Sequence, residues 1–163
     1  MGQEFSAYNQ EAARRMVVNL ATRIIDGATV LIDTNPLVYL FEGHKLAARF
    51  EPIFADIDRG RIQALVTPIT LAEVVAGPLR AEKEALATRY RQAITASLGW
   101  SLRELDADIA MLAARLRLAH RLKLPDAIQL ATAVHEGCAA LVTHDRDFTD
   151  VTDIQILGTD RKS

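Results

Sequence analysis

The chain has 163 residues, of which 50% are apolar, and it contains only 5 prolines and 8 glycines. This length supports one hydrophobic core and is too short for two, and the formal net charge of −2 excludes a global electrostatic attraction to nucleic acid. The single cysteine, Cys138, cannot form an internal disulfide, and Asp33 and Glu42 interrupt the best candidate for a membrane span, so we expect a cytoplasmic protein with no membrane contact.

Residues 1–28 are predicted to form an N-terminal extension ahead of a domain that occupies residues 29–163. Within this extension, residues 10–25 have apolar positions at the spacing of an amphipathic helix. Such a helix could cap the domain or pack on a partner subunit. Alternatively, Met16 could be the true start of the protein.

The first predicted strand is the apolar run "ATVLI" at residues 28–32, which ends at Asp33. A helix is expected to follow it. Pro36 fits the first turn of that helix, with Thr34 or Asn35 as its cap, because short polar side chains accept hydrogen bonds from the first free backbone N–H groups.

The next strand is predicted over residues 62–67, and a helix capped by Thr67 follows it directly. The Gly-Pro pair at 77–78 is expected to end this helix. A long charged helix is then predicted over residues 79–97, followed by a short strand within residues 100–105.

The last third of the chain is predicted to hold two helices and two strands. Asp106 caps a helix whose apolar residues recur at spacings of three and four, and Pro125 starts a second helix that Gly137 ends. Residues 139–143 and 153–157 are the predicted strands. Apolar strands without alternation, separated by helices, indicate an α/β/α sandwich with a mostly parallel central sheet, in which ligands bind at the carboxyl ends of the strands.

Several acidic residues fall where such a sheet places its binding sites. Asp33 and Asp145 follow predicted strands, Glu73 lies on the helix after the second strand, and Asp126 lies in the first turn of its helix. Each one alone has an ordinary explanation as a helix cap, a turn former or an exposed helix residue. Together at one edge they would repel one another unless a cation neutralised them. Oxygen ligands favour Mg²⁺ or Mn²⁺ over zinc, and pairs of such ions support phosphodiester cleavage.

Four segments in this order and spacing resemble the PIN domain, and in size and pattern the VapC-type toxins of bacterial toxin-antitoxin pairs. The segments are "VLIDTN", "TPITLAEV", "LPDAIQLATAV" and "LVTHDRDF", and the resemblance covers about residues 29–158. Each motif alone is weak, but the ordered set is specific.

The resemblance implies a Mg²⁺- or Mn²⁺-dependent ribonuclease whose four acidic positions are Asp33, Glu73, Asp126 and Asp145. Asp33, Asp126 and Asp145 would hold metal, and Glu73 would be a further ligand or would orient the attacking water. Asn35 and Thr143 would position the carboxylates. The resemblance also implies an RNA substrate, an antitoxin partner and a homodimer.

Two other functions remain open from the sequence. A PIN-like module could serve as an inactive or regulatory protein that binds RNA or protein, and it would then show no stabilisation by metal. A phosphatase of the haloacid-dehalogenase type would use Asp33 as a nucleophile. That chemistry needs a second acid two residues later, where this chain has Asn35, so it ranks last.

Overall fold

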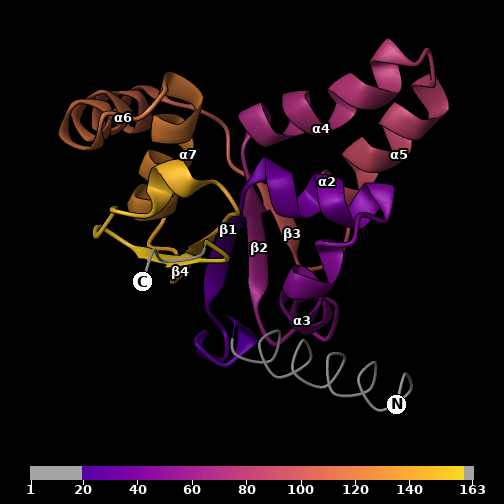
Figure 1. The fold of residues 1–163 in the computed structure, drawn as a ribbon, viewed down its shortest axis with the longest axis horizontal. Helices are drawn as coiled ribbons and strands as arrows, with labels where there is room; N and C mark the ends of the chain where they lie inside the picture. The colour runs from indigo at the N-terminus through magenta and orange to yellow at the C-terminus, as the bar shows by residue number, and fades with distance from the viewer. Residues whose placement is uncertain (1–19, 160–163) are drawn as a thin grey trace, which may run out of the picture.

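A five-stranded, all-parallel sheet forms the centre of the computed structural model, which describes residues 20–159 (Figure 1). The strands lie in the order β3-β2-β1-β4-β5. Their bounds are β1 (Thr29–Ile32), β2 (Gln63–Val66), β3 (Trp100–Leu102), β4 (Ala140–Val142) and β5 (Gln155–Leu157). The helices are α2 (Thr34–Glu42), α3 (Ala47–Asp58), α4 (Pro68–Arg80), α5 (Glu84–Thr95), α6 (Ala107–His120), α7 (Leu124–His135) and the short 3₁₀ helix η1 (Arg146–Phe148).

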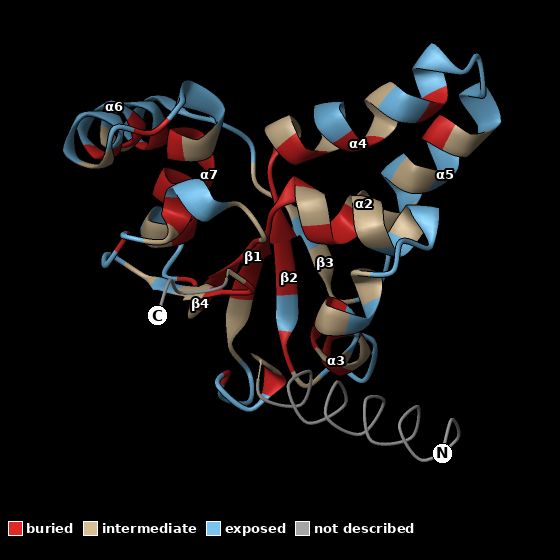
Figure 2. Cartoon of the chain, viewed as in Figure 1, coloured by how far each residue is buried: buried red, intermediate tan, exposed pale blue. Residues whose placement is uncertain are grey.

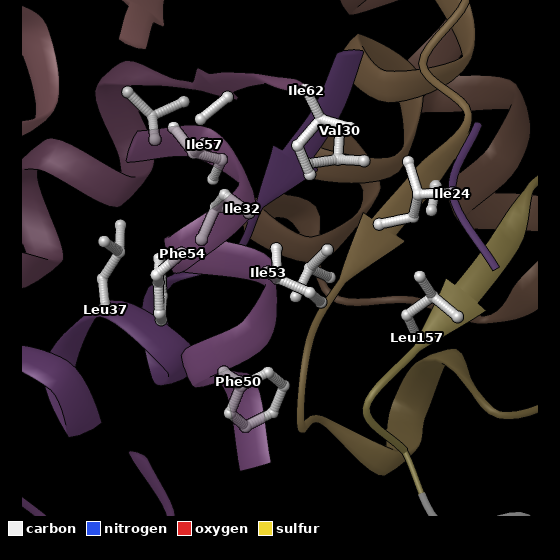
Figure 3. Packing of buried hydrophobic residues seen from close by; sticks show 14 of the residues in the cluster. Ile24, Val30, Ile32, Leu37, Phe50, Ile53, Phe54, Ile57, Ile62 and Leu157 are labelled. Atoms are coloured by element: carbon white, nitrogen blue, oxygen red, sulfur yellow. The ribbon is translucent and has the colours of Figure 1, made fainter. Parts of the chain in front are cut away.

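Helices cover both faces of this sheet, and each face has its own hydrophobic cluster. Val30 and Ile32 of β1 pack with the apolar side chains of α3, whereas Leu31 packs with α6 and α7. Figure 3 shows the first cluster, and Figure 2 shows that the central strands are largely buried. Strands buried on both faces have no reason to alternate apolar and polar residues, which is the pattern of the sequence. The predicted α/β fold with a mostly parallel sheet is thereby confirmed.

Helix α2 begins one or two residues earlier than the sequence predicted. Its cap is Asp33, whose side chain accepts a hydrogen bond from the backbone N–H of Thr34. The prediction of Thr34 or Asn35 as the cap is therefore wrong. The caps predicted for the later helices are confirmed, since the Thr67 and Asp106 side chains accept hydrogen bonds at the starts of α4 and α6.

The prediction that the Gly-Pro pair at 77–78 ends α4 is wrong, because the helix continues to Arg80. The fixed φ of proline fits helical geometry, and the buried Pro78 ring packs in the last turn. The chain turns instead at Glu82, which has a φ of 58°. The charged helix predicted over 79–97 is consequently shorter, and α5 spans Glu84–Thr95.

Helix α3 was not predicted, although its apolar residues Phe50, Ile53, Phe54 and Ile57 have helical spacing. Pro52 lies inside the helix, and the charged Asp56 is buried among the apolar side chains. Arg59 and Arg61 form ion pairs with this carboxylate. Burial alone would raise the pKa of this carboxyl, but hydrogen bonds from Arg61 and Arg59, together with their charges, hold it below the usual value.

The helix predicted over residues 10–25 lies mostly outside the described residues. The described part of the extension packs on the domain, because Ile24 is buried in the core and Arg61 donates hydrogen bonds to the carbonyls of Ala21 and Ile24. Within residues 20–159, no helix combines the length and the apolar character needed to cross a bilayer.

Candidate functional site

The acidic residues singled out from the sequence lie around the carboxyl edge of the sheet. Asp33 follows β1 directly, and Asp145 comes shortly after the neighbouring strand β4. Asp126 lies in the first turn of α7, and Glu73 lies on α4, which follows β2. Parallel strands end at the same edge, so the topology collects side chains that are far apart in the sequence.

Three carboxylates form the tightest group at this edge. One oxygen from each of Asp126, Asp145 and Asp147 lies within 4.8 Å of the others. Burial, followed by the charges of Asp145, Asp33 and Asp147, raises the pKa of Asp126 to about 6. The charge of Asp33 contributes to this shift, so Asp33 lies near the group, although its oxygens are not within the same tight cluster. Asp147 was not among the acids singled out from the sequence, and its place beside Asp126 is seen only in the structure.

Asp33 is buried, and three hydrogen bonds fix its carboxylate. Its Oδ1 accepts from the Thr34 backbone N–H at 2.8 Å and from Gln129 Nε2 at 3.0 Å, and its Oδ2 accepts from Thr143 Oγ1 at 2.7 Å. Donors of this kind stabilise a buried carboxylate in one orientation. The Oδ2 atom accepts a single bond among the described residues, so it keeps a lone pair for a cation.

Gln129 connects α7 to the start of α4. It donates to Asp33 and also, at 2.7 Å, to Thr70 Oγ1, while its Oε1 accepts from Thr67 Oγ1 at 2.5 Å. Gln129 and both threonines are buried. Because each of these buried groups is paired, the network favours one arrangement of α7, the start of α4 and the end of β1. Gln129 was not predicted from the sequence. Its only signal there is a single amide side chain in an apolar helix, three residues after Asp126.

Thr143 joins the ends of two neighbouring strands. Its hydroxyl donates to Asp33 and accepts from the Asp145 backbone N–H at 3.0 Å. Asp145 in turn caps η1 by accepting from the Asp147 N–H at 2.9 Å. The side chain of Thr143 therefore links Asp33 to the chain segment that carries the other two carboxylates.

Glu73 is exposed, but partial desolvation of its carboxylate and the charge of Asp33 raise its pKa. The Thr34 hydroxyl opposes this shift. That hydroxyl is buried and lacks a partner within normal hydrogen-bond geometry among the described residues, so its effect on Glu73 is that of a nearby dipole. Asn35, predicted to position a carboxylate, is only half-buried, and its side chain forms no hydrogen bond with these acids within the described residues.

The donor set fits a hard divalent cation. Its atoms are carboxylate oxygens held close together, and the only cysteine, Cys138, is buried elsewhere with a thiol pKa raised to about 11, chiefly by burial. Oxygen ligands of this kind are typical for Mg²⁺ or Mn²⁺. Asp126, Asp145 and Asp147 could hold such an ion directly, with Asp33 beside them.

Comparison with known proteins gives one family. The sequence profile of the PIN domain matches residues 30–154. None of the curated protein sequences matches this chain. Among solved structures, a toxin-antitoxin complex from Klebsiella pneumoniae has a chain with 32% sequence identity and a TM-score of 0.60, covering 77% of this chain and 94% of that one.

More distant structures share the fold. A chain of VapBC2 from Rickettsia felis, solved with a DNA fragment from its promoter, has 16% identity and a TM-score of 0.63, covering 78% of this chain and 96% of that one. VapC20 from Mycobacterium tuberculosis, described as a toxin that cleaves the sarcin-ricin loop, has 17% identity and a TM-score of 0.60, covering 74% and 92%. With its parallel sheet, its acidic edge and the profile match over residues 30–154, this chain belongs to the PIN domain family.

Proposed function

We propose that this protein is a metal-dependent endoribonuclease of the VapC toxin type, which hydrolyses RNA phosphodiester bonds at the carboxyl edge of its sheet. The observation that carries the proposal is the gathering of Asp126, Asp145 and Asp147 within 4.8 Å, next to the buried Asp33. Charges this close destabilise the folded protein unless a cation binds them, so their proximity is best explained by a role in binding a cation.

Asp33, Asp126 and Asp145 are the proposed metal ligands, with Asp147 as a further carboxylate beside them. Mg²⁺ or Mn²⁺ bound there would activate water and stabilise the leaving oxygen of the phosphodiester. Glu73 is proposed as a ligand or as the group that orients the attacking water. Its raised pKa favours the protonated form more than in a free glutamate, so it is suited to exchange a proton with water.

The buried hydrogen bonds around Asp33 serve this chemistry by keeping its carboxylate in place. Thr143 and Gln129 each donate to one of its oxygens, so the carboxylate is oriented before a substrate arrives. Asn35 remains a proposed positioning residue.

An antitoxin is the proposed partner. The Klebsiella pneumoniae structure, with 32% identity over 77% of this chain, is a toxin-antitoxin complex. Occlusion of the acidic edge by a partner would keep the nuclease inactive. A homodimer is a further prediction.

The decisive experiment is RNA cleavage by purified protein with Mg²⁺ or Mn²⁺, compared with EDTA. Asp33→Asn and Asp126→Asn are expected to abolish cleavage, because each removes a charge from the proposed metal site. Asp58→Asn is the matched control, since Asp58 is exposed at the end of α3, away from the acidic edge, and it should cleave like the unchanged protein.

Circular dichroism must show that each variant keeps its secondary structure. Undiminished cleavage by both site variants would refute the assignment of these carboxylates. A protein that binds RNA but never cleaves it with either metal would favour the regulatory module instead.

A further inference from the structure

Aromatic rings that are far apart in the sequence lie together beside the acidic edge. The Tyr39 hydroxyl and His144 Nδ1 form a hydrogen bond of 2.8 Å, and His144 immediately precedes Asp145. The Tyr39 ring also stacks on His44, with ring centroids 4.9 Å apart and planes at 25°. Tyr39 therefore contacts both histidine rings, since its ring also lies edge to face with His144 at a centroid distance of 5.7 Å. We call Tyr39, His44 and His144 the aromatic strip.

The outer end of this strip has a fixed position. Gly43 ends α2 in the left-handed conformation at φ 63°, and the next N–H, that of His44, bonds to the Tyr39 carbonyl at 2.9 Å. The Leu46 N–H then donates to His44 Nδ1 at 3.1 Å. The backbone and the ring of His44 are thus both anchored, which reduces the entropy that a ligand must remove on binding.

The inner part of the strip rests on the core. Phe50 is fully buried and lies edge to face with His144 at 6.2 Å, and tilted against Tyr39 at the same centroid distance. Exposure increases outward, because Tyr39 and His144 are half-buried and His44 is exposed. An exposed ring supported from beneath by a second ring is suited to stack on a planar ligand.

Two cationic residues lie close to the strip in the sequence. Lys45 follows His44, Arg146 follows Asp145, and both side chains are exposed. Neither forms an ion pair with another residue in the range 20–159. Cations spaced along aromatic rings are typical of surfaces that follow a single-stranded nucleic acid, where rings stack on bases and cations contact phosphates.

We propose that the exposed face of His44, supported by Tyr39, stacks on a nucleobase of single-stranded RNA that lies next to the bond cleaved at the acidic edge. This subsite rests on the proposed function for its substrate, and it makes His44 a residue that binds RNA rather than one that reacts. A strand with a phosphate at the carboxylates would pass His144 and Tyr39 before its neighbouring base reaches His44. Tyr39 is the positioning residue of this stack.

Fluorescence can detect the stack without cleavage. The only tryptophan, Trp100, is replaced by Phe, and His44→Trp then places an indole at the outer end of the strip. Binding of a short single-stranded oligoribonucleotide, with Ca²⁺ in place of Mg²⁺ and intact RNA verified on a gel, should quench this indole. The matched control is His135→Trp in the same background, because His135 is exposed at the opposite end of α7 from Asp126, and it should show no quenching.

The affinity for RNA provides an independent measurement, made in protein that keeps Trp100. His44→Ala is expected to weaken binding of the same oligoribonucleotide about tenfold, as loss of one base–aromatic stack typically does, and His44→Phe should restore it. His135→Ala should bind like the unchanged protein.

The outcomes separate this subsite from the proposed function. Unchanged affinity of His44→Ala, or equal quenching at positions 44 and 135, overturns the stack even if the protein cleaves RNA. Quenching at position 44 alone, with affinity restored by Phe, supports the stack even if cleavage with Mg²⁺ or Mn²⁺ is never observed. A complete lack of RNA binding overturns the subsite as well.

Discussion

At the scale of single residues, Asp126 carries the largest electrostatic cost at the acidic edge. Burial and the charges of Asp145, Asp33 and Asp147 raise its pKa from 3.8 to about 6. Between these values the folded protein binds more protons than the unfolded chain. The contribution of Asp126 to the free energy of unfolding is therefore fully present below pH 3.8 and is lost as the pH rises through about 6.

We predict that Asp126→Asn stabilises the metal-free protein, because the amide keeps the shape of the side chain and carries no charge. A shift of this size, reduced by solvent screening, corresponds to a gain of about 1–2 kcal/mol in the free energy of unfolding above about pH 6. The gain should shrink as the pH approaches about 4. Urea denaturation in EDTA at several pH values measures it. Asp58→Asn should give no such gain, and equal stability of Asp126→Asn and the unchanged protein at every pH would contradict the prediction.

The sequence could predict that acids such as Asp33 and Asp145 reach the sheet edge, but it did not identify Asp147 there or what surrounds these acids. Asp33 and Asp145 follow apolar strands, and the carboxyl ends of parallel strands meet. Gln129 has no such pattern, because an amide in an apolar helix is equally compatible with an exposed position. Asp147 was ambiguous for another reason, since acids after a strand also form turns.

At the scale of elements, the site depends on how closely the ends of β4 and β5 approach each other. Thr143 donates its N–H to the Leu157 carbonyl at 2.9 Å, directly before Gly158. A Cβ at Gly158 would lie 2.4 Å from the Thr143 carbonyl oxygen and 2.5 Å from the Phe50 ring, and its φ is 109°. This glycine allows the strand end that carries Thr143 to pack against β5.

We predict that Gly158→Ala lowers the free energy of unfolding by about 2–4 kcal/mol, because both the backbone conformation and the space exclude a methyl group. Gly60→Ala is the matched control. Its φ of 74° is also left-handed, but nothing lies within 4 Å of the added Cβ, so it should lose only about 1 kcal/mol. Urea denaturation compares the two variants. Equal losses would show that contact with Thr143 and Phe50 adds no cost.

Among the elements, helices with a clear start signal could be predicted, whereas the Gly-Pro stop signal at 77–78 was misleading and α3, which has internal conflicts, was not predicted. Thr67 and Asp106 are polar caps before apolar helical spacing, and both helices start there. Helix α3 lacks a side-chain cap and contains Pro52, so its apolar spacing was the only signal. The ion pairs that compensate the buried Asp56 form with Arg59 and Arg61, beyond the end of the helix, and are visible only in the structure.

At the scale of the whole molecule, the acidic edge joins elements from both sides of the sheet. Asp33 lies between β1 and α2, Asp126 begins α7, and Asp145 follows β4. These elements belong to different hydrophobic clusters, since α2 packs with the cluster of Val30 and α7 with that of Leu31. Repulsion between these carboxylates therefore opposes the packing of the elements that carry them. A bound cation would neutralise this repulsion.

The last prediction follows from this arrangement: Mn²⁺ should raise the melting temperature of the whole domain. A ligand that binds only the folded state, at about a hundred times its dissociation constant, stabilises that state by about 2.7 kcal/mol. For a domain of this size the rise is about 5–10 °C. Asp126→Asn should lose most of the rise and Asp58→Asn should keep it, while NaCl at equal ionic strength controls for screening. An unchanged melting temperature in Mn²⁺ would favour a regulatory module without metal, because a cation that does not bind the carboxylates cannot stabilise the folded state.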